Sequence, residues 1–194
     1  MTQPQHSNGI DVNALQQFST SVNQNLAAGK AGFAVHTTWM GGTRTRATTG
    51  VMTLGDRALT RPYVITADEP QALLGRDSAP NPQELLLAAL NACMAIDYVA
   101  NAAAMGIEID SMTIRSSGEL DLRGFLGLDV AVNPGYDTVT VEVDIHSMAP
   151  PERLKELHTR VRRTSPNVNC FVRPINLDIR TRHYPFESCT AQRT

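Results

Sequence analysis

Several features are scarce in this chain of 194 residues, and each scarcity excludes a class of protein. The three cysteines form no CxxC pair, which argues against a disulfide framework and against a zinc site. The formal net charge is only −2, so no electrostatic field favours nucleic acid or an anionic membrane as a partner. His36, His146 and His158 lack metal-ligand spacing. We therefore expect neither a metal nor another cofactor.

The N-terminus lacks both the basic region and the apolar core of a secretory signal, so we expect a cytoplasmic protein. No repeat with a period of about 20 to 50 residues is visible. The length suits a single domain with a sizeable core. We divide the chain into an N-terminal extension over residues 1–29, a main domain over 30–182 and a C-terminal tail over 183–194. The extension is expected to carry a short helix over 10–29, with the residues before it disordered.

One segment, residues 80–106, is apolar on all its faces, and we expect the rest of the chain to pack against it. Asn81 can cap a helix there, Pro82 suits the first helical position, and Glu84 can complete a capping box. Gly106 supplies a left-handed stop. With no polar stripe wide enough for solvent, this helix should be enclosed by protein.

Polar side chains in the middle of this helix argue against a membrane span. Asp97, Asn91 and Asn101 interrupt the apolar run well short of the roughly 20 residues that a bilayer requires. Cys93, Asp97 and Asn101 follow one another at intervals of four and therefore share one edge of the helix. A thiol and a carboxylate on a buried helix are candidates for chemistry, although Asp97 has a simpler interpretation as a paired carboxylate at a helix contact.

The remaining pattern predicts an α+β fold. Strands are expected where apolar and polar residues alternate, over 33–40, 43–49, 60–67, 107–122, 138–146 and 174–180. An amphipathic helix is expected from Pro150, and Ser165-Pro166 should break it and restart a short helix that Ser165 caps. Strands before and after the central helix favour antiparallel sheets.

The run NPQELLLAALNACMAIDYVANAAAMGIEI, with GELDLRGFLGL and SPNVNCFVRPINL after it, resembles the OsmC/Ohr family of osmotically induced and organic-hydroperoxide-resistance proteins. The resemblance extends from about Phe33 to Arg180. It implies antiparallel sheets wrapped around a long buried central helix in an intertwined homodimer, with sites at the dimer interface. It also implies thiol-dependent reduction of organic hydroperoxides.

The resemblance assigns catalytic roles residue by residue. Cys93 matches the peroxidatic cysteine of the central helix. The activating arginine of the early hairpin matches Arg44, with Arg46 as the second choice. Where the peroxidase branches have a glutamate after Asn-Pro, this chain has Gln83, and Glu84 is the next residue. Glu84 is thus both a catalytic candidate and a capping residue.

A second departure concerns the resolving cysteine, which the peroxidase branches place directly before a proline. This chain has Ser165 there, and Cys170 follows five residues later as a possible resolving thiol. The resemblance implies a peroxidase that uses Cys93, an organic hydroperoxide and an external thiol reductant. The departures at Gln83 and Ser165 favour an alternative. The alternative is an inactive OsmC-like protein that binds an apolar small molecule at the dimer interface.

Overall fold

The computed structural model describes residues 6–185, so the predicted tail beyond residue 185 lies outside the described residues. Its centre is helix α2 (Pro82–Met105), as the sequence predicts. The Asn81 side chain accepts a hydrogen bond from the Glu84 N–H at 2.9 Å, and the Glu84 carboxylate accepts one from the Asn81 N–H at 2.8 Å. Gly106 ends the helix with a φ of 65°. Both predicted end signals are confirmed.

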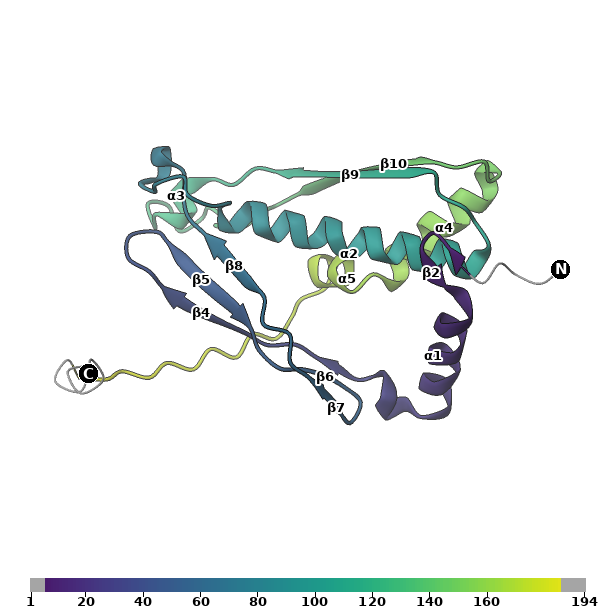
Figure 1. Ribbon diagram of the computed structural model, residues 1–194. Helices are drawn as coiled ribbons and strands as arrows, with labels where there is room; N and C mark the ends of the chain where they lie inside the picture. The colour runs from purple at the N-terminus through teal and green to yellow at the C-terminus, as the bar shows by residue number, and fades with distance from the viewer. Residues whose placement is uncertain (1–5, 186–194) are drawn as a thin grey trace.

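A two-stranded antiparallel sheet lies along one side of α2, and a pair of helices packs against α2 as well (Figure 1). Strands β9 (Ser111–Gly118) and β10 (Val139–His146) run along the helix, and α4 (Pro151–Thr164) and α5 (Pro166–Val172) follow them in the chain. The core at this junction consists of buried residues from α2 and α4 with Ile107 between them: Leu90, Met94, Tyr98, Ala102, Ile107, Leu157 and Val161.

A second layer lies on the other side of α2 (Figure 1). Its larger sheet has the order β4-β5-β8, with β4 (Val35–Trp39), β5 (Thr45–Thr49) and β8 (Val64–Ala67) all antiparallel. A smaller sheet consists of β3 (Ala31–Gly32), β6 (Met52–Leu54) and β7 (Arg57–Leu59). The sequence analysis missed β6 and β7, whose turn is the left-handed Gly55. Short elements Gln71–Leu73 (η2) and Leu122–Phe125 (α3) lie in loops.

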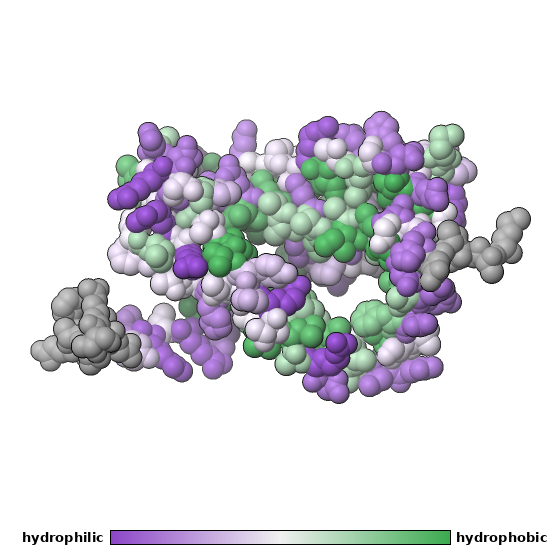
Figure 2. All heavy atoms as spheres, viewed as in Figure 1, coloured by the Kyte–Doolittle hydropathy of each residue, from purple (hydrophilic) through white to green (hydrophobic). Residues whose placement is uncertain are grey.

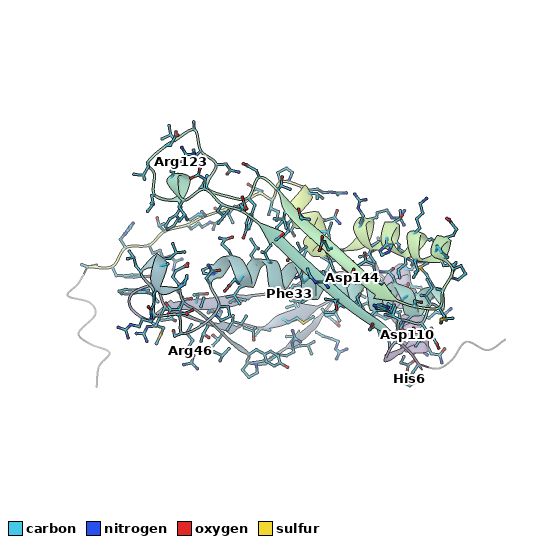
Figure 3. The ribbon with its side chains drawn as sticks, turned by 90° about the horizontal axis from the view of Figure 1, so that it is seen from above. His6, Phe33, Arg46, Asp110, Arg123 and Asp144 are labelled. Atoms are coloured by element: carbon cyan, nitrogen blue, oxygen red, sulfur yellow. The ribbon has the colours of Figure 1, made fainter. Side chains whose placement is uncertain are left out.

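The N-terminal extension begins with a small hairpin, where the sequence predicted disorder. β1 (His6–Ser7) pairs with β2 (Ile10–Asp11), and helix α1 (Val12–Gln24) follows with a 3₁₀ turn, η1 (Leu26–Gly29). The Asn8 side chain donates to the Ile107 carbonyl and accepts from the Ile109 N–H, both at 2.8 Å. These two bonds imitate a strand pairing and fasten the extension beyond the end of α2. His6 and Asp110 accordingly lie at the same end of the molecule (Figure 3).

One predicted strand needs correction. Residues 174–180 form no strand: the segment is extended and exposed, because no strand among the described residues is paired with it. Helix α2 keeps one face open in the single chain, since Ile96 is 68% exposed. Apolar side chains lie open on the face between the two layers (Figure 2). The chain exposes 15157 Å², against roughly 9,000 Å² expected for a compact monomer of its mass.

Candidate functional site

The thiol of Cys93 lies between a carboxylate and a hydroxyl. Its Sγ is 3.7 Å from Asp97 Oδ2 and 3.7 Å from Ser165 Oγ. Cys93 is half-buried, whereas Ser165 is fully buried. The structure thus brings together the predicted peroxidatic cysteine and the residue at the position of the resolving cysteine. These two positions are 72 residues apart in the chain.

The break between α4 and α5 aims the Ser165 hydroxyl at the thiol. Ser165 occupies the N-cap position of α5 as predicted, but its side chain makes no capping hydrogen bond. Its backbone is held on both sides, because its N–H donates to the Val161 carbonyl at 2.9 Å and its own carbonyl accepts from the Asn169 side chain at 2.8 Å. Asn167 donates to the Ala89 carbonyl at 2.8 Å and fixes α5 to α2 one turn before Cys93. The hydroxyl therefore has a well-defined place beside the sulfur.

Asp97 affects the thiol electrostatically. The contact that it makes with Sγ is a hydrogen bond from the protonated thiol to the carboxylate. A thiolate at this distance would instead be repelled by the carboxylate charge. Asn101 donates to the Asp97 backbone carbonyl at 2.8 Å and leaves the carboxylate free to face the sulfur. Within one chain the two polar contacts of the sulfur are thus with a carboxylate and a hydroxyl, and neither brings a positive charge to it.

The predicted arginines do not supply this charge within one chain. Arg44 donates from Nη2 to the Met40 carbonyl at 3.1 Å, and among the described residues no hydrogen bond links it to Cys93. Its Nε is buried and has no partner in that part of the chain. Arg46 is exposed on β5, in the sheet of the second layer (Figure 3). The buried, unpartnered Nε distinguishes Arg44 from an ordinary exposed arginine.

The other predicted site residues lie away from the sulfur contact. Glu84 belongs to the first turn of α2, and its carboxylate is engaged in the capping box. Cys170 is a free, exposed thiol inside α5. Of the candidates, the structure therefore places only Ser165 and Asp97 in contact with Cys93. The Asp97 contact follows from helical spacing, whereas the Ser165 contact could be suggested only by the family motif.

An apolar cavity of about 290 Å³ lies on the neighbouring face of α2, between α2, β10 and α5. Its walls are mainly aliphatic, and Tyr98 and Arg162 are its polar members. The Tyr98 hydroxyl lies 2.9 Å from His158 Nδ1, and burial raises the pKa of Tyr98, an effect that the charge of Arg162 partly opposes. Leu90 and Met94, which line this cavity, flank Cys93 in the helix. Sequence reasoning missed the Tyr98–His158 pair, which joins α2 to α4.

Over residues 6–185, no group of three or more histidine, cysteine, aspartate or glutamate side chains is placed to hold a metal ion. One helix, α2, is long and apolar enough to cross a membrane, with a mean hydropathy of 1.5. The central helix of a soluble protein passes the same test, so this is weak evidence for a membrane span.

Comparison with known proteins agrees with this architecture. The family model described as OsmC-like protein matches residues 75–180, which is more than half of the chain. Among solved structures, an OsmC-like protein from Mycoplasma pneumoniae is 18% identical with a TM-score of 0.57, and the match covers 73% of this chain and 87% of that one. A Psychrobacter arcticus protein named for osmotic stress and detoxification is 20% identical with a TM-score of 0.53, covering 70% and 85%. No curated protein matches the sequence.

The fold is thus an α+β arrangement of antiparallel sheets about a long helix, like that of the solved OsmC-like structures. The chain belongs to the OsmC family. These two solved structures are 18% and 20% identical to the chain, so their similarity bears on the fold alone. The chemistry has to be argued from the residues around Cys93.

Proposed function

We propose that this protein is a thiol-dependent peroxidase that reduces organic hydroperoxides at Cys93. The observation that carries the proposal is the contact between Cys93 Sγ and the buried Ser165 hydroxyl, 3.7 Å apart. A thiol that served only as core filling would be surrounded by apolar atoms. Cys93 instead lies at a half-buried polar junction of α2 and the α4–α5 break, with a carboxylate on its other side.

In the first step, the Cys93 thiolate attacks the terminal oxygen of the hydroperoxide. The S–O bond forms as the O–O bond breaks, so the sulfur is oxidised to sulfenic acid and the peroxide leaves as an alcohol after it takes up a proton. The Ser165 hydroxyl can donate a hydrogen bond to the thiolate or to the new sulfenic oxygen. A cationic group must offset the charge of Asp97 during the attack.

In the second step, an external thiol reduces the sulfenic acid. Its sulfur displaces the hydroxyl group, water leaves, and a mixed disulfide remains that a second thiol reduces to regenerate Cys93. Serine at position 165 cannot form a disulfide with Cys93, so the resolving thiol in this proposal comes from outside. Cys170 lies on another turn of α5 and is exposed, and we propose that it does not act as an efficient resolving thiol.

We also propose that the active form is a homodimer in the cytoplasm. The excess exposed area and the open apolar face of α2 are what a partner subunit would cover. The unpaired segment 174–180 supports the same proposal, because it presents Ile175, Leu177 and Ile179 in alternation, each at least 64% exposed. An extended segment of this kind is suited to adding a strand to a sheet of the second copy.

The dimer would also be the source of the missing positive charge. Arg44 carries a buried Nε without a partner in the described residues, while Asp97 carries a charge without a countercharge near Cys93. We propose that dimer assembly brings Arg44 to the thiol, with Arg46 as the second choice. Glu84 remains a candidate for orienting the arginine, in addition to its capping role.

Peroxide consumption tests this function. The purified protein is mixed with cumene hydroperoxide and excess dithiothreitol, and loss of peroxide is followed. We expect turnover with the wild type and with Cys170→Ser, and none above background with Cys93→Ser. Arg44→Lys should lower the rate more than Arg61→Lys, because Arg61 is an exposed arginine that stacks on Tyr63 elsewhere. Equal turnover by Cys93→Ser would refute the proposal.

A second function is favoured by the 290 Å³ apolar cavity beside α2. If Cys93 does not react, the protein would be a binder of an apolar small molecule, which the aliphatic walls of the cavity suit. A fluorescent apolar probe distinguishes the two. Val141→Arg places a charge in the cavity wall. If the protein is a binder, this variant should no longer bind the probe. If it is an enzyme, peroxide consumption is the activity to measure.

A further inference from the structure

A separate cavity of about 370 Å³ lies where the N-terminal extension meets the body of the protein. Helix α1 forms one wall, the last turns of α2 form a second, and α4 contributes a single residue. Its lining residues are Val12, Leu15, Gln16, Ser19, Ala100, Asn101, Ala104 and Arg160. Half of the lining therefore comes from residues before position 75, which the family model does not match.

The lining of this cavity combines apolar side chains with a single positive charge. Four of its side chains are apolar, three are neutral and polar, and Arg160 bears the one formal charge. Arg160 is exposed at the rim of the cavity, and within residues 6–185 its guanidinium makes no hydrogen bond or ion pair that would compete with a ligand. Elsewhere on α4, Arg153 shows the contrast, since it pairs with Glu156 at 3.1 Å. No carboxylate lines the cavity to compete for Arg160.

Asn101 adds a second requirement. Its Nδ2 is committed to the Asp97 carbonyl, which leaves its Oδ1 as an acceptor. A ligand that satisfies the cavity thus needs an anionic group for Arg160, a hydrogen-bond donor for Asn101, and an apolar part against the aliphatic residues of α1 and the alanines of α2. The volume of about 370 Å³ lies near the lower end of the range of small-molecule pockets, which suits a small ligand.

We propose that this cavity is a binding site for a small organic carboxylate that carries a hydroxyl or similar donor, distinct from the site at Cys93. The carboxylate accepts from the Arg160 guanidinium, the donor faces Asn101 Oδ1, and the apolar part lies against Leu15 and Ala104. Because α1 forms a whole wall, bound ligand ties the N-terminal extension to α2. The proposal does not depend on the peroxidase activity.

Isothermal titration of the full-length protein with 4-hydroxyphenylacetate tests the site. We expect saturable binding with a Kd below about 1 mM, the affinity that one charge-assisted contact with apolar burial can provide. The neutral amide of the same compound should bind at least tenfold more weakly, and phenylacetate, which lacks the donor, should lie between the two. Binding should persist in Cys93→Ser, whatever the outcome of the peroxide assay.

Two variants complete the experiment. Arg160→Gln should weaken binding of 4-hydroxyphenylacetate at least tenfold, whereas Arg163→Gln, an exposed arginine on the same helix that does not line the cavity, should leave it unchanged. Ala104→Leu fills the cavity from the α2 side and should abolish binding, while the unchanged melting temperature confirms folding. Absence of saturable binding to wild type, or equal binding by Arg160→Gln or Ala104→Leu, would overturn the proposal.

Discussion

The Ser165 hydroxyl oxygen lies 3.7 Å from the Cys93 sulfur, across the contact between the α4–α5 break and the middle of α2. This contact predicts the behaviour of a cysteine at position 165. Ser165→Cys should form a disulfide with Cys93 after one equivalent of peroxide, because the introduced sulfur starts close to disulfide reach. Non-reducing peptide mapping would detect the crosslinked pair.

The wild-type protein is the control for this variant. Its remaining described cysteine, Cys170, is an exposed residue inside α5 rather than at the helix break. We expect no dominant Cys93–Cys170 peptide after the same treatment. A rapid and abundant crosslink between these two residues in the wild type would show that resolution is internal and that the external-thiol step is wrong.

Removing the charge of Asp97 should make the thiol more reactive. Asp97 Oδ2 lies 3.7 Å from Cys93 Sγ, where its negative charge would repel the negative charge that the sulfur carries when it reacts. Asp97→Asn keeps the shape and should accelerate alkylation of Cys93 by iodoacetamide at neutral pH by about tenfold, which corresponds to roughly 1.4 kcal/mol. Asp110→Asn, at an exposed position at the far end of α2, is the matched control. Identical rates in both variants would contradict the electrostatic role.

Asp68 gives a prediction for acid stability. It is buried and accepts hydrogen bonds from the hydroxyls of Ser78 and Thr43 and from backbone N–H groups of the following loop, and these bonds hold the pKa of Asp68 well below its usual range. Since the folded-state pKa is depressed, the stabilisation is complete above the unfolded value of about 4 and is lost as the pH falls below it.

The Asp68→Asn variant should therefore unfold more easily at neutral pH, and the difference from wild type should shrink between about pH 4 and pH 2. Urea unfolding at several pH values measures this. The bonds from Thr43 and Ser78 also tie the β4–β5 turn, next to Arg44, to the loop that leads into α2. A constant difference across the acid range would mean that the carboxylate charge is not what holds this loop.

The open apolar face predicts an obligate dimer. Sedimentation at micromolar concentration should show a homodimer and no folded monomer, because α2 leaves Ile96 68% exposed and the segment 174–180 unpaired. Ile96→Lys places a charge on this face and should lower yield or dissociate the protein. Val130→Lys, at a fully exposed loop position, is the control. A stable wild-type monomer would contradict the dimer.

The central helix could be predicted from sequence because its signals are local. Asn81, Glu84 and Gly106 act within one turn of its ends, and the apolar run fixes its length. The absence of a strand over 174–180 could not be predicted. Alternating apolar residues show that a segment can form a strand, but the strand forms only when a neighbouring strand pairs with it. The hydrogen bonds of Asp68 have no recognisable sequence pattern, because their donors come from Thr43 and from a loop of turn residues.

The site was predictable to a similar degree. Helical spacing placed Asp97 beside Cys93, whereas the Ser165 contact depends on how α4 and α5 pack on α2. The family motif identified position 165. It did not predict that the Ser165 side chain would contact the Cys93 thiol and make no capping hydrogen bond. The cavity beside α1 was invisible, since its residues come from three helices without a shared motif.

The central claim is that Cys93 is a peroxide-reactive thiol, and mass spectrometry of the intact protein tests it most directly. The protein is treated for seconds with one equivalent of cumene hydroperoxide, and dimedone then traps sulfenic acid. We predict a single dimedone adduct that peptide mapping assigns to Cys93, with Cys170 unmodified and no adduct in Cys93→Ser. An unmodified Cys93 thiol after this treatment would contradict the peroxidase and leave the apolar binder as the function.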